Sequence, residues 1–208
     1  MLFRSLAALQ VIKTEEEILR WENDSPKRFV GRTGVKAAKG GHLKLLQWAM
    51  ANDFPVGKPT IAAAAKGGHL DIIKWLVERG CEWDEWALES AANRGHLDVI
   101  QWLVEAHPND VLSRSEFITL CAAEGGHLHV LKRLREKGVP LALPEVFSIS
   151  LQNGQLEVAK WLREIGMELG PYAIDEAAGS GDLETLKWVR EHGCQWSSST
   201  FGWAASNG

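Results

Sequence analysis

The sequence has little of what secreted, membrane-spanning or nucleic-acid-binding proteins usually contain. It holds three cysteines and no C-x-x-C pair, which favours a reducing, intracellular compartment. No apolar run approaches the roughly 18 residues that span a bilayer, so no membrane partner is expected. The N-terminal stretch lacks a signal-peptide cleavage site. A net charge of −4 argues against nucleic-acid binding by bulk positive charge.

Enzyme motifs are also missing from the sequence. There is no H-E-x-x-H and no G-x-S-x-G. The segment GKPT at residues 57–60 resembles the end of a phosphate-binding loop, but the earlier glycine is absent and a proline separates lysine from threonine. We therefore expect no enzyme activity, no cofactor and no catalytic residue.

What the chain does contain is a repeat, marked by the triplet glycine-histidine-leucine. The middle residues, taken as anchors, are spaced by 27, 27, 31, 28 and 27 residues, and they are His42, His69, His96, His127, Gln155 and Asp182. Small residues stand five and four positions before most anchors. Five of the ten tryptophans stand six positions after an anchor; Arg133 takes that place in the fourth unit. A fixed period of this size indicates a stacked solenoid.

Each unit is predicted to form two helices, and the second buries the positions one, three, four, six and seven after the anchor. Proline or a capping residue begins the first helix, and glycine ends each helix. Because one helix pair cannot bury its own apolar face, the units must stack. The buried-face position of the tryptophans favours core packing over an exposed ladder. The anchor histidines are expected to hydrogen-bond in the turns rather than bind metal, since neighbouring units lie about 10 Å apart.

These residues resemble ankyrin repeats. The similarity lies in the pattern AAxxGHLxVLxxL followed by a helix-ending glycine, and it covers nearly the whole chain. The family period is about 33 residues, and the shortfall lies between the terminating glycine and the next alanine pair, where the family carries a β-hairpin finger. We therefore expect an all-α, ankyrin-like solenoid with shortened or absent fingers, similar to a tryptophan-rich variety common in large DNA viruses and some protists.

The repeat also predicts how the chain is divided. We expect a single array over residues 1–208, with a degenerate first unit at 1–28 and a half unit at 196–208. The full units are 29–55, 56–82, 83–113, 114–141, 142–168 and 169–195. A longer loop is expected at the longer spacing after His96, with Trp86 and Phe117 on either side of it and with Ser113 and Glu116 as a capping box. The half unit lacks a second helix, so we expect it to be weakly protected, and the chain to be a monomer or a fragment of a longer array.

The resemblance implies a protein–protein interaction scaffold that contacts its partner through the concave helix face. The matching positions are three and two before the anchor and ten after it. They include Lys39, Lys66, Arg79, Asn93, Arg94, Glu124, Lys137 and Gln152. Five of these eight are basic in a chain of negative net charge, which predicts a partner with an acidic surface.

An alternative function rests on aromatic residues in the first turn of the first helix. Trp86 and Phe117 hold equivalent positions, and Tyr172 holds the same position later. If these rings are exposed, they could contact a partner, and if Trp86 and Phe117 are also coplanar, stacking on a glycan or other small ligand is favoured. If they pack against the next unit, that alternative fails.

Overall fold

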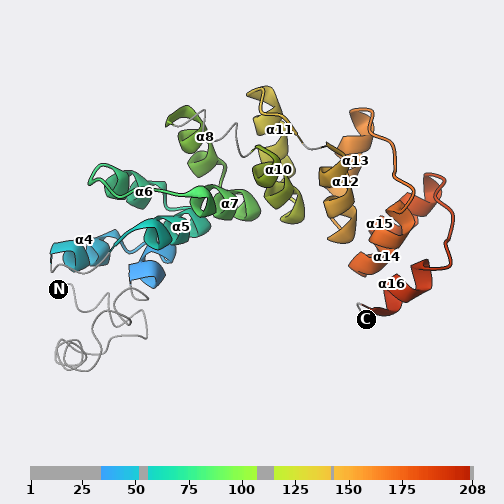
Figure 1. Ribbon diagram of the computed structural model, residues 1–208, viewed down its shortest axis with the longest axis horizontal. Helices are drawn as coiled ribbons and strands as arrows, with labels where there is room; N and C mark the ends of the chain where they lie inside the picture. Colours follow the sequence, from blue (N-terminus) through green and yellow to red (C-terminus); the bar gives the residue numbers. More distant parts are fainter. Residues whose placement is uncertain (1–33, 52–55, 107–114, 142, 207–208) are drawn as a thin grey trace. The chain divides into compact units, whose positions relative to one another are not determined.

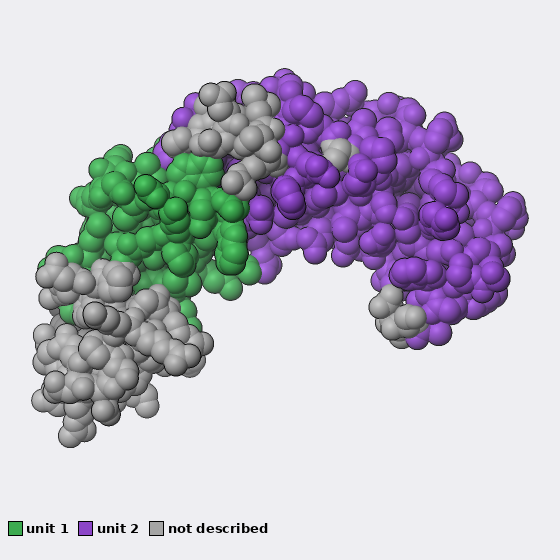
Figure 2. Space-filling view, viewed as in Figure 1, with its two compact units in different colours: residues 1–87 green, residues 88–208 purple. Residues whose placement is uncertain are grey.

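The computed structural model describes residues 34–51, 56–106, 115–141 and 143–206. The chain forms two compact units, residues 1–87 (unit 1) and 88–208 (unit 2), shown in different colours in Figure 2. In unit 1, residues 34–39 are helical and are followed by α4 (Leu43–Ala51), α5 (Lys58–Gly67) and α6 (Leu70–Val77). Helix α7 (Glu85–Arg94) begins in unit 1 and ends in unit 2.

Unit 2 continues with helices that alternate in the same way (Figure 1). They are α8 (Leu97–Ala106), α10 (Ser115–Glu124), α11 (Leu128–Glu136), α12 (Leu143–Gln152), α13 (Leu156–Glu164), α14 (Ala173–Ser180), α15 (Leu183–Glu191) and α16 (Thr200–Ser206). The first helices of the repeats, α10, α12, α14 and α16, lie side by side in that order, and α10, α12 and α14 each pack against the second helix that follows.

The prediction of an all-α fold is confirmed. The described residues contain helices, turns and irregular segments but no strand. The segments after the terminating glycines, where fingers were expected to be short, have no β-structure at 81–84 or 167–170. No helix in the described ranges is long and apolar enough to cross a membrane.

Two sets of glycines set the helix ends. Glycines before the anchors and glycines eleven positions after them all have positive φ; they are Gly41, Gly68, Gly95, Gly126, Gly154 and Gly181 in the first set and Gly80, Gly138, Gly166 and Gly193 in the second. At Gly68 the left-handed backbone lets its N–H reach the carbonyl of Ala65 and ends α5. A side chain at such a position would cost energy that glycine avoids.

The core contains small residues and larger apolar residues, such as Ile61 and Ile118, from the first helices and mainly aliphatic residues from the second helices. The pairs before the anchors are buried, including Ala64–Ala65, Ala122–Ala123 and Ser150–Leu151. In the second helices the positions three, four and seven after the anchor are buried throughout α6, α8, α11 and α13, as with Ile72, Ile73 and Leu76 in α6. Small residues in one helix allow the close approach that buries the larger ones in the next.

The predicted buried face of the second helices was too wide. The leucine directly after the anchor is half-buried in α6 and α8 and 58% exposed at Leu183. Of the tryptophans six positions after an anchor, Trp161 is buried, at 7% exposure. Trp48, Trp75, Trp102 and Trp188 are half-buried. The large indole fills the helix flank and leaves one edge in water, whereas aliphatic side chains three, four and seven positions on fit fully inside.

The anchor side chains link each turn to the preceding repeat. In unit 1, Nε2 of His69 lies 3.0 Å from the carbonyl oxygen of Lys39. In unit 2, Nε2 of His127 lies 2.8 Å from the carbonyl of Asn93, and Gln155 donates to the carbonyl of Glu124 at 3.0 Å. Because a carbonyl only accepts, each histidine Nε2 carries the hydrogen. The expected hydrogen-bonding role of these histidines is seen in the described repeats.

The glycine that precedes this turn allows the link to form. A Cβ placed on Gly67 would collide with the carbonyl oxygen of Lys39, and one on Gly125 would collide with that of Asn93. Both oxygens are the histidine acceptors of the same turns. The sequence analysis interpreted these glycines only as helix ends, so it missed their role in close backbone approach.

Helix α16 is attached to α14 by hydrogen bonds to a buried carboxylate. Asp175 in α14 accepts hydrogen bonds from the hydroxyls of Ser197, Ser199 and Thr200 at the start of α16. These hydrogen bonds hold the pKa of Asp175 below its usual value. The bond from the Thr200 hydroxyl has the largest effect, followed by those from Ser197 and Ser199. The half unit nevertheless exposes Phe201 and Trp203, at 76% and 53%. Its predicted weak protection stays a prediction.

The described helices fall two to each predicted full unit, with α16 in the half unit. The degenerate unit at 1–28 and most of the long junction, including Ser113, lie outside the described residues. That all the repeats form a single array also stays a prediction.

Candidate functional site

A narrow stripe of each first helix is left unburied. In α10 it consists of Phe117, Leu120, Cys121 and Glu124, while the residues between them are buried. These positions recur at i, i+3, i+4 and i+7, which is one face of a helix. We call this set, with its equivalents in the other first helices, the first-helix stripe. Its equivalents in unit 2 are Glu89, Ser90 and Asn93 in α7, Glu145, Ser148, Ile149 and Gln152 in α12, Tyr172 directly before α14, and Glu176 in α14. Asp175, which holds the remaining equivalent side-chain position in α14, is buried.

The structure places the predicted contact residues in three groups. Five occupy one position, at the end of the first-helix stripe: Lys39, Lys66, Asn93, Glu124 and Gln152. Arg94 is the last residue of α7. Arg79 and Lys137 follow the second helices α6 and α11. All eight are exposed except Asn93, which is half-buried.

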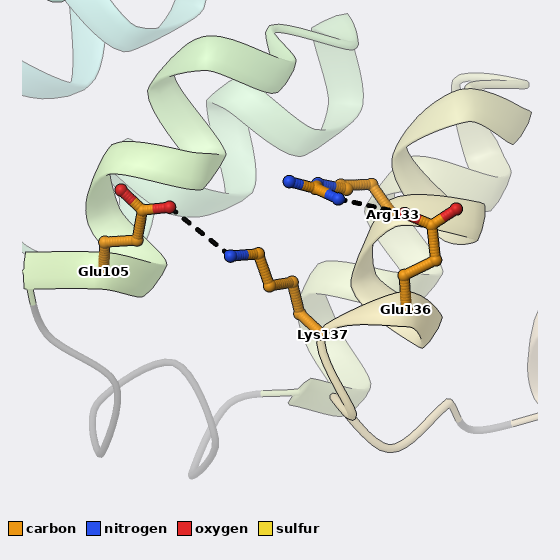
Figure 3. Close-up of polar contacts among 4 residues, drawn as sticks. All are labelled: Glu105, Arg133, Glu136 and Lys137. Atoms are coloured by element: carbon orange, nitrogen blue, oxygen red, sulfur yellow. Dashed lines mark hydrogen bonds and ion pairs between the residues drawn. The ribbon is translucent and has the colours of Figure 1, made fainter.

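Some of these residues are brought together within unit 2. The Nδ2 of Asn93 donates to Oε2 of Glu124 at 3.2 Å. The ammonium of Lys137 lies 3.4 Å from Oε1 of Glu105 in α8 (Figure 3). Both partners of this ion pair are partly exposed, so it contributes little stability. It nevertheless offsets one of the five positive charges on which the predicted acidic partner rested.

Arg79, a predicted contact residue, and Arg133, which was not predicted, make contacts within their own repeats. The guanidinium of Arg79 lies 4.4 Å from the centroid of the Trp75 ring and also donates to the Trp75 carbonyl. This cation–π contact covers the half-buried indole. In the fourth unit Arg133 takes the tryptophan position and pairs with Glu136 at 3.0 Å (Figure 3).

The first-turn aromatic rings are exposed. Trp86 is 67% exposed in unit 1, and Phe117 and Tyr172 are 60% and 69% exposed in unit 2. The competing prediction, that these rings pack between neighbouring repeats, is therefore wrong for most of their surface. The helical spacing of residues in the first helix could have predicted this exposure. It places these rings on the first-helix stripe and not on the buried face that contains the alanine pair.

A polar chain between α12 and α14 was not found by the sequence analysis. Gln152 donates to the hydroxyl of Ser148, and that hydroxyl donates to the carboxylate of Glu176. The three residues belong to adjacent helices of the row. Only the repeat register, which puts Ser148 and Glu176 on the stripe, could have indicated this contact.

Comparison with known proteins agrees with the repeat geometry. A family model described as ankyrin repeats (3 copies) matches residues 35–115. Residues 35–115 therefore contain ankyrin repeats.

A solved structure supports the ankyrin fold beyond the matched range. The crystal structure of the human ASB11 ankyrin repeat domain is similar, with a TM-score of 0.54, and the match covers 78% of this chain and 84% of that chain. The two are 17% identical, so the likeness concerns the fold alone. No curated protein matches the sequence.

Histidine, cysteine and acidic side chains are possible metal ligands and nucleophiles among the residues described. No group of three histidine, cysteine or acidic side chains there is arranged to hold a metal ion. The cysteines are free. Burial raises the pKa of Cys121 to about 11, and the neighbouring carboxylates of Glu89 and Glu124 contribute to that rise. Burial also raises the pKa of Cys81 and of Cys194, so these thiols are poor nucleophiles.

Proposed function

We propose that this protein is a binding scaffold that contacts another protein through the first-helix stripe and the residues at the ends of its helix pairs. Ankyrin repeats are generally protein–protein interaction modules. The observation that carries the proposal is the stripe itself, which exposes aromatic and charged side chains on helices whose other faces are buried. Exposed aromatic residues are enriched in protein interfaces.

For the repeats of unit 1 we propose a partner segment with acidic side chains. Lys39 and Lys66 hold the same stripe position in successive repeats, and Arg79 follows α6; all three are exposed. Exposed charges of one sign at an interface mainly accelerate association with an oppositely charged surface. An intracellular location remains a prediction that rests on the three free cysteines.

The test is a charge reversal with a matched control. Lys39→Glu with Lys66→Glu should slow association with a partner isolated from the native host, because two favourable charges become unfavourable. Lys44→Glu with Lys74→Glu makes the same charge change at exposed positions on α4 and α6, and should have little effect. Equal on-rates at low salt for both double variants would place the contact elsewhere.

Glycan or small-ligand binding is the second candidate, and the exposure of Trp86 and Phe117 favours it. A glycan array probed with the whole chain, followed by Trp86→Ala and Phe117→Ala on any positive sugar, tests this function. Binding that needs the rings and saturates would support it. An array without ring-dependent binding would reject it.

A further inference from the structure

From α10 to α16 the basic residues occur in the second helices and not in the first, while carboxylates occur in both kinds of helix; α7 differs, because it ends at Arg94. The first helices α10, α12, α14 and α16 contain no lysine or arginine within their bounds. Each of the second helices α11, α13 and α15 contains at least two, and these are Lys132, Arg133, Arg135, Lys160, Arg163, Lys187 and Arg190. The side of the repeats formed by the first helices is therefore acidic, although the second helices beside it are rich in bases.

Three carboxylates of α10, α12 and α14 lie on the first-helix stripe, whereas Glu116 lies off it and Asp175 is buried. Glu124, Glu145 and Glu176 lie on α10, α12 and α14, which are successive neighbours in the row. Glu89 extends the series into α7, and its charge reaches Cys121 together with that of Glu124. Hydrogen bonds from Asn93 to Glu124 and from Ser148 to Glu176 hold two of these carboxylates in place.

Exposed aromatic rings stand on either side of the middle carboxylate. Phe117 in α10, Glu145 in α12 and Tyr172 directly before α14 hold the same repeat position, and all three side chains are exposed. A ring, a carboxylate and a second ring thus follow one another along the row. An acidic surface meant only to keep the protein soluble would not need large apolar rings in water.

We propose that the first-helix stripe of unit 2 binds a cationic, arginine-containing segment of the partner protein. This inference rests on the proposed function and specifies the chemistry of the partner at that surface. The carboxylates supply the charge complementarity. A guanidinium can stack on an aromatic face while it donates two parallel hydrogen bonds to a carboxylate, and the row offers both kinds of group. A lysine ammonium can use the charges but matches the flat rings less well.

Two triple variants of the whole chain test the charges. Glu124→Gln, Glu145→Gln and Glu176→Gln neutralise the stripe and keep an oxygen that accepts the Ser148 hydrogen bond. Glu136→Gln, Glu164→Gln and Glu191→Gln remove the same number of carboxylates at exposed positions in the last turns of α11, α13 and α15. The probe is a fluorescent peptide of eight arginines, and anisotropy gives its Kd at low and at physiological salt.

We expect the stripe triple to weaken binding of the arginine peptide by about tenfold at low salt, and the control triple by less than about twofold. Phe117→Ala with Tyr172→Ala should weaken the arginine peptide more than an eight-lysine peptide. Equal weakening by the two triples would show attraction to net charge alone and would overturn the proposal. Binding that neither triple changes would overturn it as well.

The outcome is separable from that of the scaffold proposal. If Lys39→Glu with Lys66→Glu slows a natural partner while the stripe triple leaves arginine-peptide binding intact, the scaffold function stands and the cationic partner segment is wrong. If the stripe triple weakens both the peptide and the natural partner, the two proposals are supported together.

Discussion

Asp175 is the residue on which the attachment of α16 most depends, because it accepts three hydroxyl hydrogen bonds from the start of that helix. Those bonds lower the folded-state pKa of Asp175, so its contribution is present above the unfolded value of about 3.9 and is lost as the pH falls through the folded value. Asp175→Asn should speed amide exchange in α16 at pH 7, and the difference from the parent should shrink in acid as the pH falls through the lowered folded-state pKa of Asp175. Hydrogen exchange with mass spectrometry at pH 7 and in acid measures it.

The control for this prediction is Asp98→Asn, which removes an exposed carboxylate from the first turn of α8. It should leave exchange in α16 unchanged at either pH. An Asp175→Asn effect of the same size at pH 7 and in acid would contradict the link between ionisation and the docking of α16.

Gly125 is a residue whose lack of a side chain can be tested without the complication of a left-handed backbone. A Cβ there would collide with the Asn93 carbonyl oxygen, and no positive φ is involved. Gly125→Ala should destabilise the protein by about 1–3 kcal/mol because the inserted methyl forces backbone apart. Gly170→Ala, where nothing lies within 4 Å, should be neutral or slightly stabilising. Thermal unfolding followed by circular dichroism compares the two, and equal effects would contradict the close approach.

At the scale of the helix, the second helices differ in how deeply they bury their tryptophan. Trp161→Ala in α13 should cost about 3–5 kcal/mol, since the ring is almost completely inside. Trp75→Ala in α6 should cost clearly less, because the indole is half-buried and partly covered by Arg79. Urea unfolding of both variants measures the difference. The same small loss for both would mean that Trp161 does not contribute to the core.

Helix α15 begins differently from the other second helices. Its anchor residue is Asp182, whose carboxylate accepts from the backbone N–H of Thr185 at 2.8 Å and from its hydroxyl. This is an N-cap contact, and Asp182→Ala should cost about 1 kcal/mol, whereas Asp182→Asn should retain most of the stability. Thermal unfolding distinguishes the two, and an equal loss in both would show that the charge, not the cap, matters.

The helix scale is also where sequence reasoning succeeded best. Turn glycines, alanine pairs and the 27-residue period predict helix ends to within a residue or two, because backbone conformation at those positions depends on local chemistry. The Trp75 and Trp102 rings were expected to be buried because the period gives a direction but not a depth. How deep an indole lies depends on the neighbouring helix, and one repeat does not contain that information.

At the scale of the whole molecule, each repeat is stabilised by itself and by its neighbours. Phe201 and Trp203 on α16 remain exposed, so a helix added after them has apolar surface to cover. Extending the chain beyond Gly208 with a second helix copied from residues 68–80 should raise the Tm by about 2–4 °C for each kcal/mol gained. A copy with its apolar positions changed to serine is the control. The prediction fails if both extensions act alike.

The candidate site was predicted less completely than the fold. The stripe position of Lys39, Lys66, Asn93, Glu124 and Gln152 follows from the repeat alone. The Lys137–Glu105 ion pair and the chain from Gln152 to Glu176 do not, because they join different repeats and depend on side-chain rotamers. Charge was first counted over the whole set of contact positions, which concealed that the first helices of unit 2 are acidic.

The hydrogen bond from an anchor side chain to the preceding turn makes the repeats modular. His69, His127 and Gln155 each bond to a backbone carbonyl of the preceding repeat. Every such repeat therefore supplies one hydrogen-bond donor to the repeat before it and one acceptor to the repeat after it. A duplicated repeat would therefore fit between two existing ones without any other substitution. Gene duplication could lengthen or shorten such a protein by whole units, and its binding surface could evolve one repeat at a time.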